Sequence, residues 1–214
     1  MRRTYLAVAR LGFAALAVVA ILAQLADLAS RGTLNPVNFF SYFTIQSNLI
    51  AIAALVLPAV AALAAQSADP RRFDMLRGGA VVYMTVTGVV YGLLLSGTDV
   101  DTALSWVNDV VHRLMPIVIV IDWLLDPPVV RIELRRSLVW VLYPVAWIAY
   151  TMVRGALVTW YPYPFLDPAP NGYGPVILTI AVIFAAGIGL CLLVAWVGNA
   201  LRDRRRDTSA AGTR

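Results

Sequence analysis

The sequence contains no lysine, a single cysteine and a single histidine. The lone cysteine, Cys191, excludes an intrachain disulfide framework and a metal site built from cysteines. The lone histidine excludes a multi-histidine metal centre, and the acidic residues show no spacing typical of a carboxylate metal cage. A Walker loop, a dinucleotide-binding fingerprint and a GxSxG elbow are also absent. We therefore expect a protein with no metal and no cofactor.

Charge is scarce and apolar residues are abundant, at 14% and 60% of the 214 residues. Such a chain is too apolar for an ordinary soluble domain and too long for a single membrane anchor. Six segments reach the roughly 20 residues that a helix needs to cross a bilayer. These segments are 6–29, 39–65, 77–97, 103–125, 137–159 and 174–199. We predict an all-α polytopic membrane protein with six transmembrane helices in one bundle (residues 1–200), followed by a disordered, basic cytoplasmic tail (201–214).

The seventeen basic residues are all arginines, and their distribution predicts the orientation of the chain. With the N-terminus inside, fourteen of the seventeen fall on the inner side, as the positive-inside rule requires. Both termini should then face the cytoplasm, with Trp160, Tyr161 and Tyr163 in an aromatic belt at the outer surface. The net charge of +5 is explained by this topology and by anionic inner-leaflet lipids, so we expect membrane lipids and no nucleic acid as partners. The predicted location is a bacterial plasma membrane.

The second predicted span opens with an unusual run of polar residues, NFFSYFTIQSNLI. Ser41, Thr44 and Asn48 recur at i, i+3 and i+7 and so share one helical face, with Ser47 beside them. Polar groups in a bilayer are costly unless they face protein or trapped water. A membrane Ser or Thr more often bonds its own helix or a neighbouring one than performs chemistry. The face therefore predicts a pocket wall or a helix contact in the outer half of the membrane.

The fourth predicted span carries a matching polar stripe. Asn108, His112 and Pro116 follow one another at intervals of four residues, and Asp109 precedes His112 by three. His112 lies about 13 Å along the helix at 1.5 Å per residue, which is close to the expected depth of Thr44. A lone histidine is usually a packed, hydrogen-bonded residue, and an asparagine in a membrane helix usually joins two helices.

Two arginines, Arg113 and Arg154, also fall in the outer half of the predicted bundle. Each could extend its guanidinium toward the interface, or pair with Asp27 or Asp109. Four of the six helices thus bring polar residues to the outer half, and this convergence predicts a shared pocket on the outward side.

Three segments, in this order, resemble the androgen-induced protein family of six-span membrane proteins. They are FFSYFTIQSNLI at 39–50, NDVVHRLMP at 108–116 and WIAYTMVRGALVTWYPYPFLD at 147–167. Animal members of that family hydrolyse fatty acid esters of hydroxy fatty acids, and this chain would be a bacterial-type member. The resemblance implies that Thr44 in YFT and His112 in NDVVHRLMP act together as a threonine-type lipid hydrolase.

The chain departs from the pattern of that family at two positions. Asp109 stands where the animal members tend to have a second histidine, and Arg113 stands where they tend to have a hydroxyl residue.

The sequence and the resemblance together predict an intramembrane hydrolase of lipid esters, of the fatty acid ester of hydroxy fatty acid type. Thr44 would attack the ester carbonyl, and His112 would take and return the proton. Other polar residues would orient the histidine, donate to the oxyanion or hold a substrate carboxylate. The candidates are Asp109 and Asn108 for orientation, Asn48, Ser47 and Asn108 for the oxyanion, and Arg154 and Arg113 for the carboxylate. The alternative is a non-enzymatic membrane protein that binds or transports a lipid or another amphiphile.

Overall fold

The computed structural model describes residues 2–64, 69–95 and 104–211, and these residues form helices and connecting loops with no strand among them. In chain order the elements are α1 (Arg2–Ser30), α2 (Pro36–Ser41), α3 (Phe43–Leu63), α4 (Pro70–Val90), the π-helix η1 (Tyr91–Leu95), α5 (Ser105–Asp109), the π-helix η2 (Val110–Leu114), α6 (Met115–Leu125), α7 (Leu134–Ser137), the 3₁₀-helix η3 (Leu138–Val141), α8 (Leu142–Val158), the 3₁₀-helix η4 (Pro164–Leu166) and α9 (Tyr173–Ala211). The prediction of an all-α fold is confirmed for these residues.

Five helices among the described residues are long and apolar enough to cross a membrane. They are Thr4–Ser30, Phe43–Leu63, Pro70–Leu95, Leu134–Val158 and Tyr173–Thr208. The fourth predicted span is also a continuous helix, running through α5, η2 and α6. Its apolar sequence is interrupted by three charged residues, Asp109, Arg113 and Asp122.

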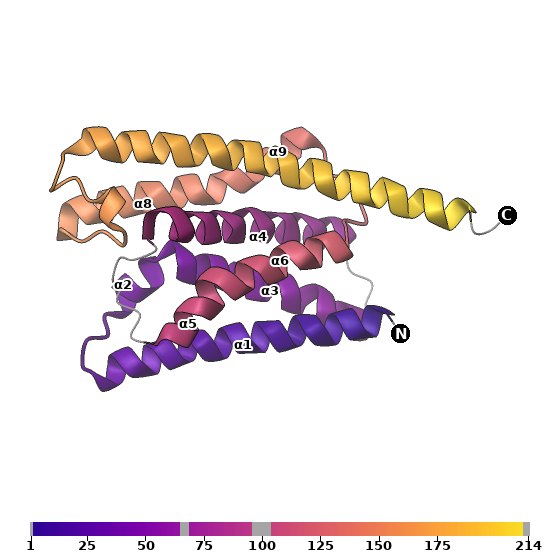
Figure 1. Ribbon diagram of the computed structural model, residues 1–214, viewed down its shortest axis with the longest axis horizontal. Coiled ribbons are helices and arrows are strands. Elements are labelled where there is room, and N and C mark those ends of the chain that lie inside the picture. The colour runs from indigo at the N-terminus through magenta and orange to yellow at the C-terminus, as the bar shows by residue number, and fades with distance from the viewer. Residues whose placement is uncertain (1, 65–68, 96–103, 212–214) are drawn as a thin grey trace.

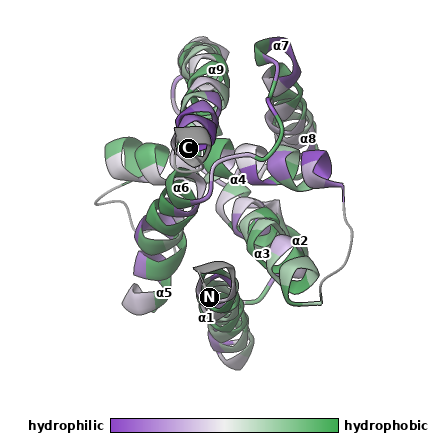
Figure 2. Cartoon of the chain, turned by 90° about the vertical axis from the view of Figure 1, so that its right-hand side faces the viewer, coloured by the Kyte–Doolittle hydropathy of each residue, from purple (hydrophilic) through white to green (hydrophobic). Residues whose placement is uncertain are grey.

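The long helices run side by side in one bundle, with α1 at one edge and α8 and α9 at the other (Figure 1). The start of α1 and the end of α9 lie at the same end of the bundle, whereas α2 and the start of α5 lie at the opposite end. Hydrophobic residues cover most of the helix surfaces, and hydrophilic ones gather at α7 and at the end of α9 (Figure 2).

Helix α1 packs on α3 through small side chains. Ala14, Ala17 and Ala20 of α1 and Ala51 and Ala54 of α3 are all at most 2% exposed and belong to one core cluster. Small residues let two helix backbones approach closely, which is the usual basis of helix association where lipid surrounds the protein. This close contact holds the start of α3 in place within the bundle.

The second predicted span is not one helix, which corrects the sequence interpretation. The chain breaks at Tyr42, whose ψ of 129° is extended, so that Ser41 ends α2 and does not share a face with Thr44. The indole N–H of Trp147 donates to the carbonyl oxygen of Ser41 (3.0 Å), which satisfies a backbone group freed by the break. The Ser41 hydroxyl instead contacts the hydroxyl of Tyr150 on α8 (2.8 Å).

The basic C-terminal segment, which the sequence led us to expect as a disordered tail, is helical as far as Ala211; residues 212–214 lie outside the described residues. Arg202 donates to the carbonyl oxygen of Val129 (3.0 Å), and Arg205 donates to that of Leu125 (2.6 Å). These contacts with the connection after α6 give the basic residues partners, so α9 continues beyond the apolar part of the bundle.

A buried ionic cluster joins α1, α4 and α6 at the end of the bundle where α1 begins. Arg10 Nε lies 2.6 Å from Asp122 Oδ1, and Arg77 Nη2 lies 2.9 Å from Asp122 Oδ2. Asp126 adds a second carboxylate, 2.9 Å from Arg10 Nη2. Because Arg10, Arg77 and Asp122 are all buried, each charge depends on the others for compensation.

Candidate functional site

Thr44 and His112, the two residues singled out in the sequence, contact each other in the structure. Thr44 Oγ1 lies 3.1 Å from Nε2 of His112, and both residues are buried, at 6% and 7% exposed. Thr44 is the second residue of α3, directly after the break at Tyr42, and His112 is the central residue of η2. A hydroxyl and an imidazole nitrogen at hydrogen-bond distance are the geometry that a nucleophile and its general base require.

The local backbone around His112 departs from an α-helix. The π-helical turn η2 shifts the hydrogen-bonding pattern of this helix, and such turns are frequent at functional sites. Pro116 lacks the N–H that would donate to the carbonyl of His112. At Gly88 of α4 a Cβ atom would lie 3.1 Å from Cβ of Pro116 and 3.4 Å from the carbonyl oxygen of His112. The glycine therefore lets α4 approach the turn that carries the histidine.

Tyr91, the first residue of η1, holds one face of the His112 ring. The two rings stack with centroids 4.3 Å apart and planes inclined by 20°. The side-chain N–H of Asn108 donates to the hydroxyl of Tyr91 (2.5 Å). Asn108 thus acts on the imidazole through Tyr91. Its backbone carbonyl also interacts with the imidazole of His112, four residues further along the helix. Nδ1 of His112 nevertheless makes no hydrogen bond of standard geometry among the described residues.

Asp109 does not orient His112, contrary to one of the two options drawn from the sequence. Its carboxylate forms an ion pair with Arg113, one turn later on the same helix, and both side chains are more than half exposed. The same ion pair engages Arg113, whose guanidinium also lies over the ring of Tyr91, 5.7 Å from its centroid.

The hydroxyl of Tyr163 is a third group at the Thr44 contact. It lies 3.2 Å from Thr44 Oγ1 and accepts a hydrogen bond from the backbone N–H of Thr44 (3.2 Å). Burial raises the pKa of Tyr163 to about 12, so the phenol stays protonated at neutral pH. Sequence reasoning assigned this tyrosine to an interfacial belt. The only signal for a role at the site was its position in the aromatic WYPYPFLD segment that carries the family resemblance.

Ser47 and Asn48 hold the backbone around the site. The Ser47 hydroxyl donates to the carbonyl of Thr44 (3.1 Å) and contacts the hydroxyl of Thr87 on α4 (2.9 Å). The side-chain amide of Asn48 donates to the carbonyls of Thr44 (2.8 Å) and Val111 (3.1 Å). Asn48 therefore joins the backbone beside the threonine to the backbone beside the histidine. Its amide hydrogens are engaged in this way, which leaves Tyr163 as the better-placed donor to an oxyanion.

Arg154 lies near the outer rim of the site and not at the Thr44 contact. Its guanidinium donates to the side-chain oxygen of Asn38 (2.6 Å) and lies over the ring of Trp160, 4.9 Å from the centroid. Asn38 and Trp160 line a cavity that also includes Thr44 and His112. Arg154 thus contacts residues that line the cavity but does not line it itself.

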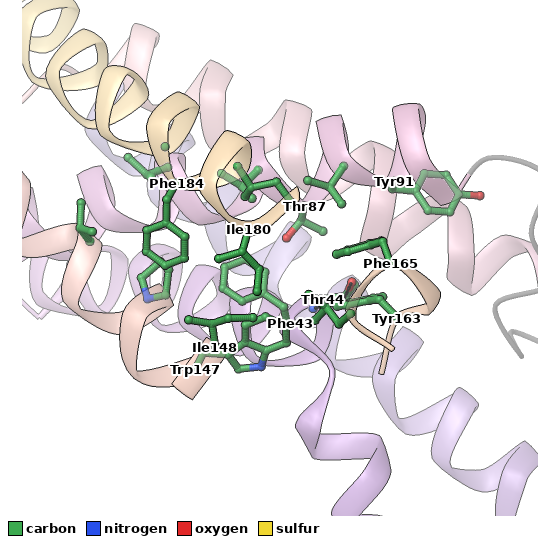
Figure 3. Close-up of a pocket in the computed structure, with 18 of the residues that line it drawn as sticks. Phe43, Thr44, Thr87, Tyr91, Trp147, Ile148, Tyr163, Phe165, Ile180 and Phe184 are labelled. Atoms are coloured by element: carbon green, nitrogen blue, oxygen red, sulfur yellow. Dashed lines mark hydrogen bonds between the residues drawn. The ribbon is translucent and has the colours of Figure 1, made fainter. Parts of the chain in front are cut away.

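Thr44 borders two cavities. The first is an apolar cavity of about 840 Å³ bounded mainly by α4, η3, α8 and α9 (Figure 3). The second is a polar cavity of about 870 Å³ bounded by α1, α2, the start of α3 and η2. Both volumes include space that is open to the surroundings. Thr44, Leu95 and Tyr163 line both cavities, so the hydroxyl of Thr44 lies where the two meet.

Comparisons with known protein families, with curated proteins and with solved structures give no match for this chain. The class of protein is therefore defined by the fold and the site alone. It is a bundle of apolar helices with a buried threonine–histidine contact between an apolar and a polar cavity.

Proposed function

We propose that this chain is an integral membrane protein of six spans that hydrolyses lipid esters, with Thr44 as the nucleophile and His112 as its base. The observation that carries the proposal is the 3.1 Å contact between Thr44 Oγ1 and His112 Nε2 at the meeting point of two cavities. A hydroxyl paired with an imidazole, next to an apolar cavity, suits acyl transfer from an ester with a hydrocarbon chain.

The helices and the arginines support the proposed membrane setting. Five helices have the length and apolarity of a span, and the sixth buries His112 and Asp122 against neighbouring helices and exposes the Asp109–Arg113 pair. The end of the bundle with the ionic cluster carries most of the arginines, so the positive-inside rule puts it, and both termini, in the cytoplasm. A bacterial plasma membrane is the proposed location, and the site then opens toward the outer leaflet.

In the proposed first step the Thr44 oxygen bonds to the carbonyl carbon of the ester while its proton passes to Nε2 of His112. This requires the tautomer of His112 with its hydrogen on Nδ1. The carbonyl oxygen becomes an oxyanion, to which the Tyr163 hydroxyl donates. His112 then returns the proton to the departing alkoxide as the ester C–O bond breaks.

In the second step water replaces the alcohol. His112 takes a proton from water as the water oxygen attacks the acyl-threonine, and it returns that proton to Thr44 as the free acid leaves. The substrate class implied by the resemblance is a fatty acid ester of a hydroxy fatty acid. We assign Arg154, which contacts the polar cavity through Asn38, to the carboxylate of such a substrate, since Arg113 is engaged with Asp109.

A fluorophosphonate probe tests the nucleophile directly, since it labels activated hydroxyls covalently. We expect labelling of the wild type and none of Thr44→Ala. Thr33→Ala is the matched control, because Thr33 lines the same polar cavity but does not contact His112. Equal labelling of the Thr44→Ala and Thr33→Ala variants would rule out Thr44 as the nucleophile.

The alternative, a membrane protein that binds or transports an amphiphile, is favoured by one observation. Nδ1 of His112 makes no standard hydrogen bond to an acidic side chain among the described residues, so the third member of a conventional triad is not present there. A binder of this kind would retain lipid in the two cavities without covalent labelling and without turnover.

A further inference from the structure

The apolar cavity has one polar end and one hydrocarbon end. Figure 3 shows Thr44, Tyr163 and Phe165 grouped at one end, with Ile180 and Phe184 of α9 facing Phe43, Trp147 and Ile148 across the space. Along α9 the lining extends from Ile180 to Cys191, about 16 Å at 1.5 Å per residue. The cavity is thus elongated, and its polar end is the candidate catalytic contact.

The polar cavity on the other side of Thr44 has a different lining. Gln24, Thr33, Asn35 and Asn38 supply amide and hydroxyl groups there, whereas α4, α8 and α9 supply mainly aliphatic and aromatic side chains to the apolar cavity. An ester has two sides, its acyl chain and its alcohol. The two cavities offer an apolar and a hydrogen-bonding environment on the two sides of the same hydroxyl.

We propose that the apolar cavity is the binding site for the acyl chain of the ester, and that the alcohol portion lies in the polar cavity. The assignment of the two sides of an ester rests on the proposed hydrolase function, but the binding of a single acyl chain between α4, α8 and α9 does not.

The selectivity of such a site for chain length depends on how well the acyl chain fits the cavity, and not on the exclusion of water. Lipid tails are as apolar as the side chains that line the cavity, so transfer from the bilayer gives little hydrophobic gain. A chain is held because its length and width match the available space, and a side chain that occupies part of that space shortens the chain that can enter.

Two glycines on α9 provide a matched pair for this test. Gly187 lines the cavity, and a Cβ atom there would meet nothing within 4 Å. Gly189 is also open at its Cβ position, but it is exposed and does not line the cavity. Leucine at either position adds the same volume to the same helix, and only at position 187 does the added side chain enter the cavity.

The experiment measures equilibrium binding of radiolabelled palmitate and octanoate to the purified full-length protein in detergent. Gly187→Leu should weaken palmitate binding at least about 10-fold, the low end of what a methylene-sized change in an apolar pocket provides, and should leave octanoate binding within about twofold. Gly189→Leu should leave both affinities unchanged. Equal palmitate affinity in the two variants would overturn the proposal.

If Gly187→Leu does not fold, Phe184→Ala tests the acyl-binding proposal instead, because it enlarges the same cavity. It should raise the affinity for stearate relative to palmitate, and an unchanged ratio would count against the proposal. A parallel turnover assay separates the two ideas. If Gly187→Leu changes the chain length that binds but the wild type shows no ester turnover, the acyl site is retained and the hydrolase function is rejected. If turnover depends on Thr44 but palmitate binding is unaltered in Gly187→Leu, only the acyl site is rejected.

Discussion

The ring of Tyr91 lies against the imidazole of His112, with centroids 4.3 Å apart. Each residue belongs to a π-helical turn, and the two turns come from different parts of the chain, η1 after α4 and η2 within the helix formed by α5 and α6. Because the stacked ring fixes the plane of the imidazole, it fixes the direction in which Nε2 faces Thr44. Asn108, which donates a hydrogen bond to Tyr91, is therefore a positioning residue.

Asn108→Ala should lower turnover by about 10- to 100-fold, because a small displacement of a catalytic group has effects of that order. The effect should fall on kcat and not on KM. Asp109→Ala, at the next position, should change turnover less than about twofold, since its carboxylate pairs with Arg113 and does not contact His112. Steady-state kinetics with a long-chain ester checks both. A larger loss in Asp109→Ala than in Asn108→Ala would reverse the assignment made from the structure.

Removing Thr44 and His112 together should cost little more than removing either alone, because members of one catalytic unit are strongly non-additive. We expect Thr44→Ala and His112→Ala each to abolish most turnover while membrane expression and thermal stability are retained. Thr44→Ser should keep partial activity, since it retains the hydroxyl but loses the methyl group that restricts its rotamer. Full turnover in both alanine variants would rule out Thr44 and His112 as the catalytic pair.

Tyr163→Phe removes the hydroxyl that lies 3.2 Å from Thr44 Oγ1. Loss of one oxyanion donor typically costs about 10²- to 10³-fold in kcat, and we expect a loss in that range. Tyr161→Phe is the control, since Tyr161 belongs to the same loop and does not line either cavity. Single-turnover measurements should show slower acylation in Tyr163→Phe only. Equal kinetics in the two variants would mean that another group stabilises the oxyanion.

The sequence predicted the helices well because length and apolarity determine where a helix can cross a bilayer, and five of the predicted spans have counterparts of that kind. The pairing of Thr44 with His112 could also be anticipated, since the predicted spans bring both residues to a similar depth. The break at Tyr42 could not, because it depends on a hydrogen bond from Trp147, more than a hundred residues away. The break at Tyr42 places Ser41 on α2, whereas Thr44, Ser47 and Asn48 share one face of α3.

Supporting residues were harder to predict than the central pair. Asp109 has the right spacing to approach His112 along an ideal helix, but the neighbouring Arg113 offers a full opposite charge on the exposed side and takes its carboxylate. Tyr163 comes from a loop, whose path no periodicity reveals. The stacking of Tyr91 depends on two π-helical turns, and hydrophobic patterns with a period of 3.6 residues do not signal such turns.

The orientation in the membrane can be tested with single cysteines in a Cys191→Ser background. Asn171→Cys lies in the exposed connection before α9, and Arg206→Cys lies on the exposed end of α9. In intact cells a membrane-impermeant maleimide should label position 171 and not position 206, and permeabilised cells should show labelling of both. Labelling of both positions in intact cells, or of position 206 alone, is incompatible with cytoplasmic termini.

The buried ionic cluster should be a larger determinant of stability than any exposed ion pair. Asp122 faces Arg10 at 2.6 Å and Arg77 at 2.9 Å, and all three are buried. Asp122→Ala would leave two buried guanidinium groups with fewer partners, which typically costs about 3–5 kcal/mol. Asp109→Ala also removes an aspartate from an arginine pair, but that pair is exposed and should contribute only about 0–1 kcal/mol.

Thermal unfolding of the purified protein in detergent compares the two alanine variants. Asp122→Ala should melt well below the wild type, and Asp109→Ala close to it. A second variant, Asp122→Ala with Arg10→Met, should recover part of the loss, because it removes one of the two buried guanidinium groups left with fewer partners. If the double variant were less stable than Asp122→Ala, the destabilisation would come from lost packing around Arg10 and not from its charge, and the cluster would not act through ion pairing.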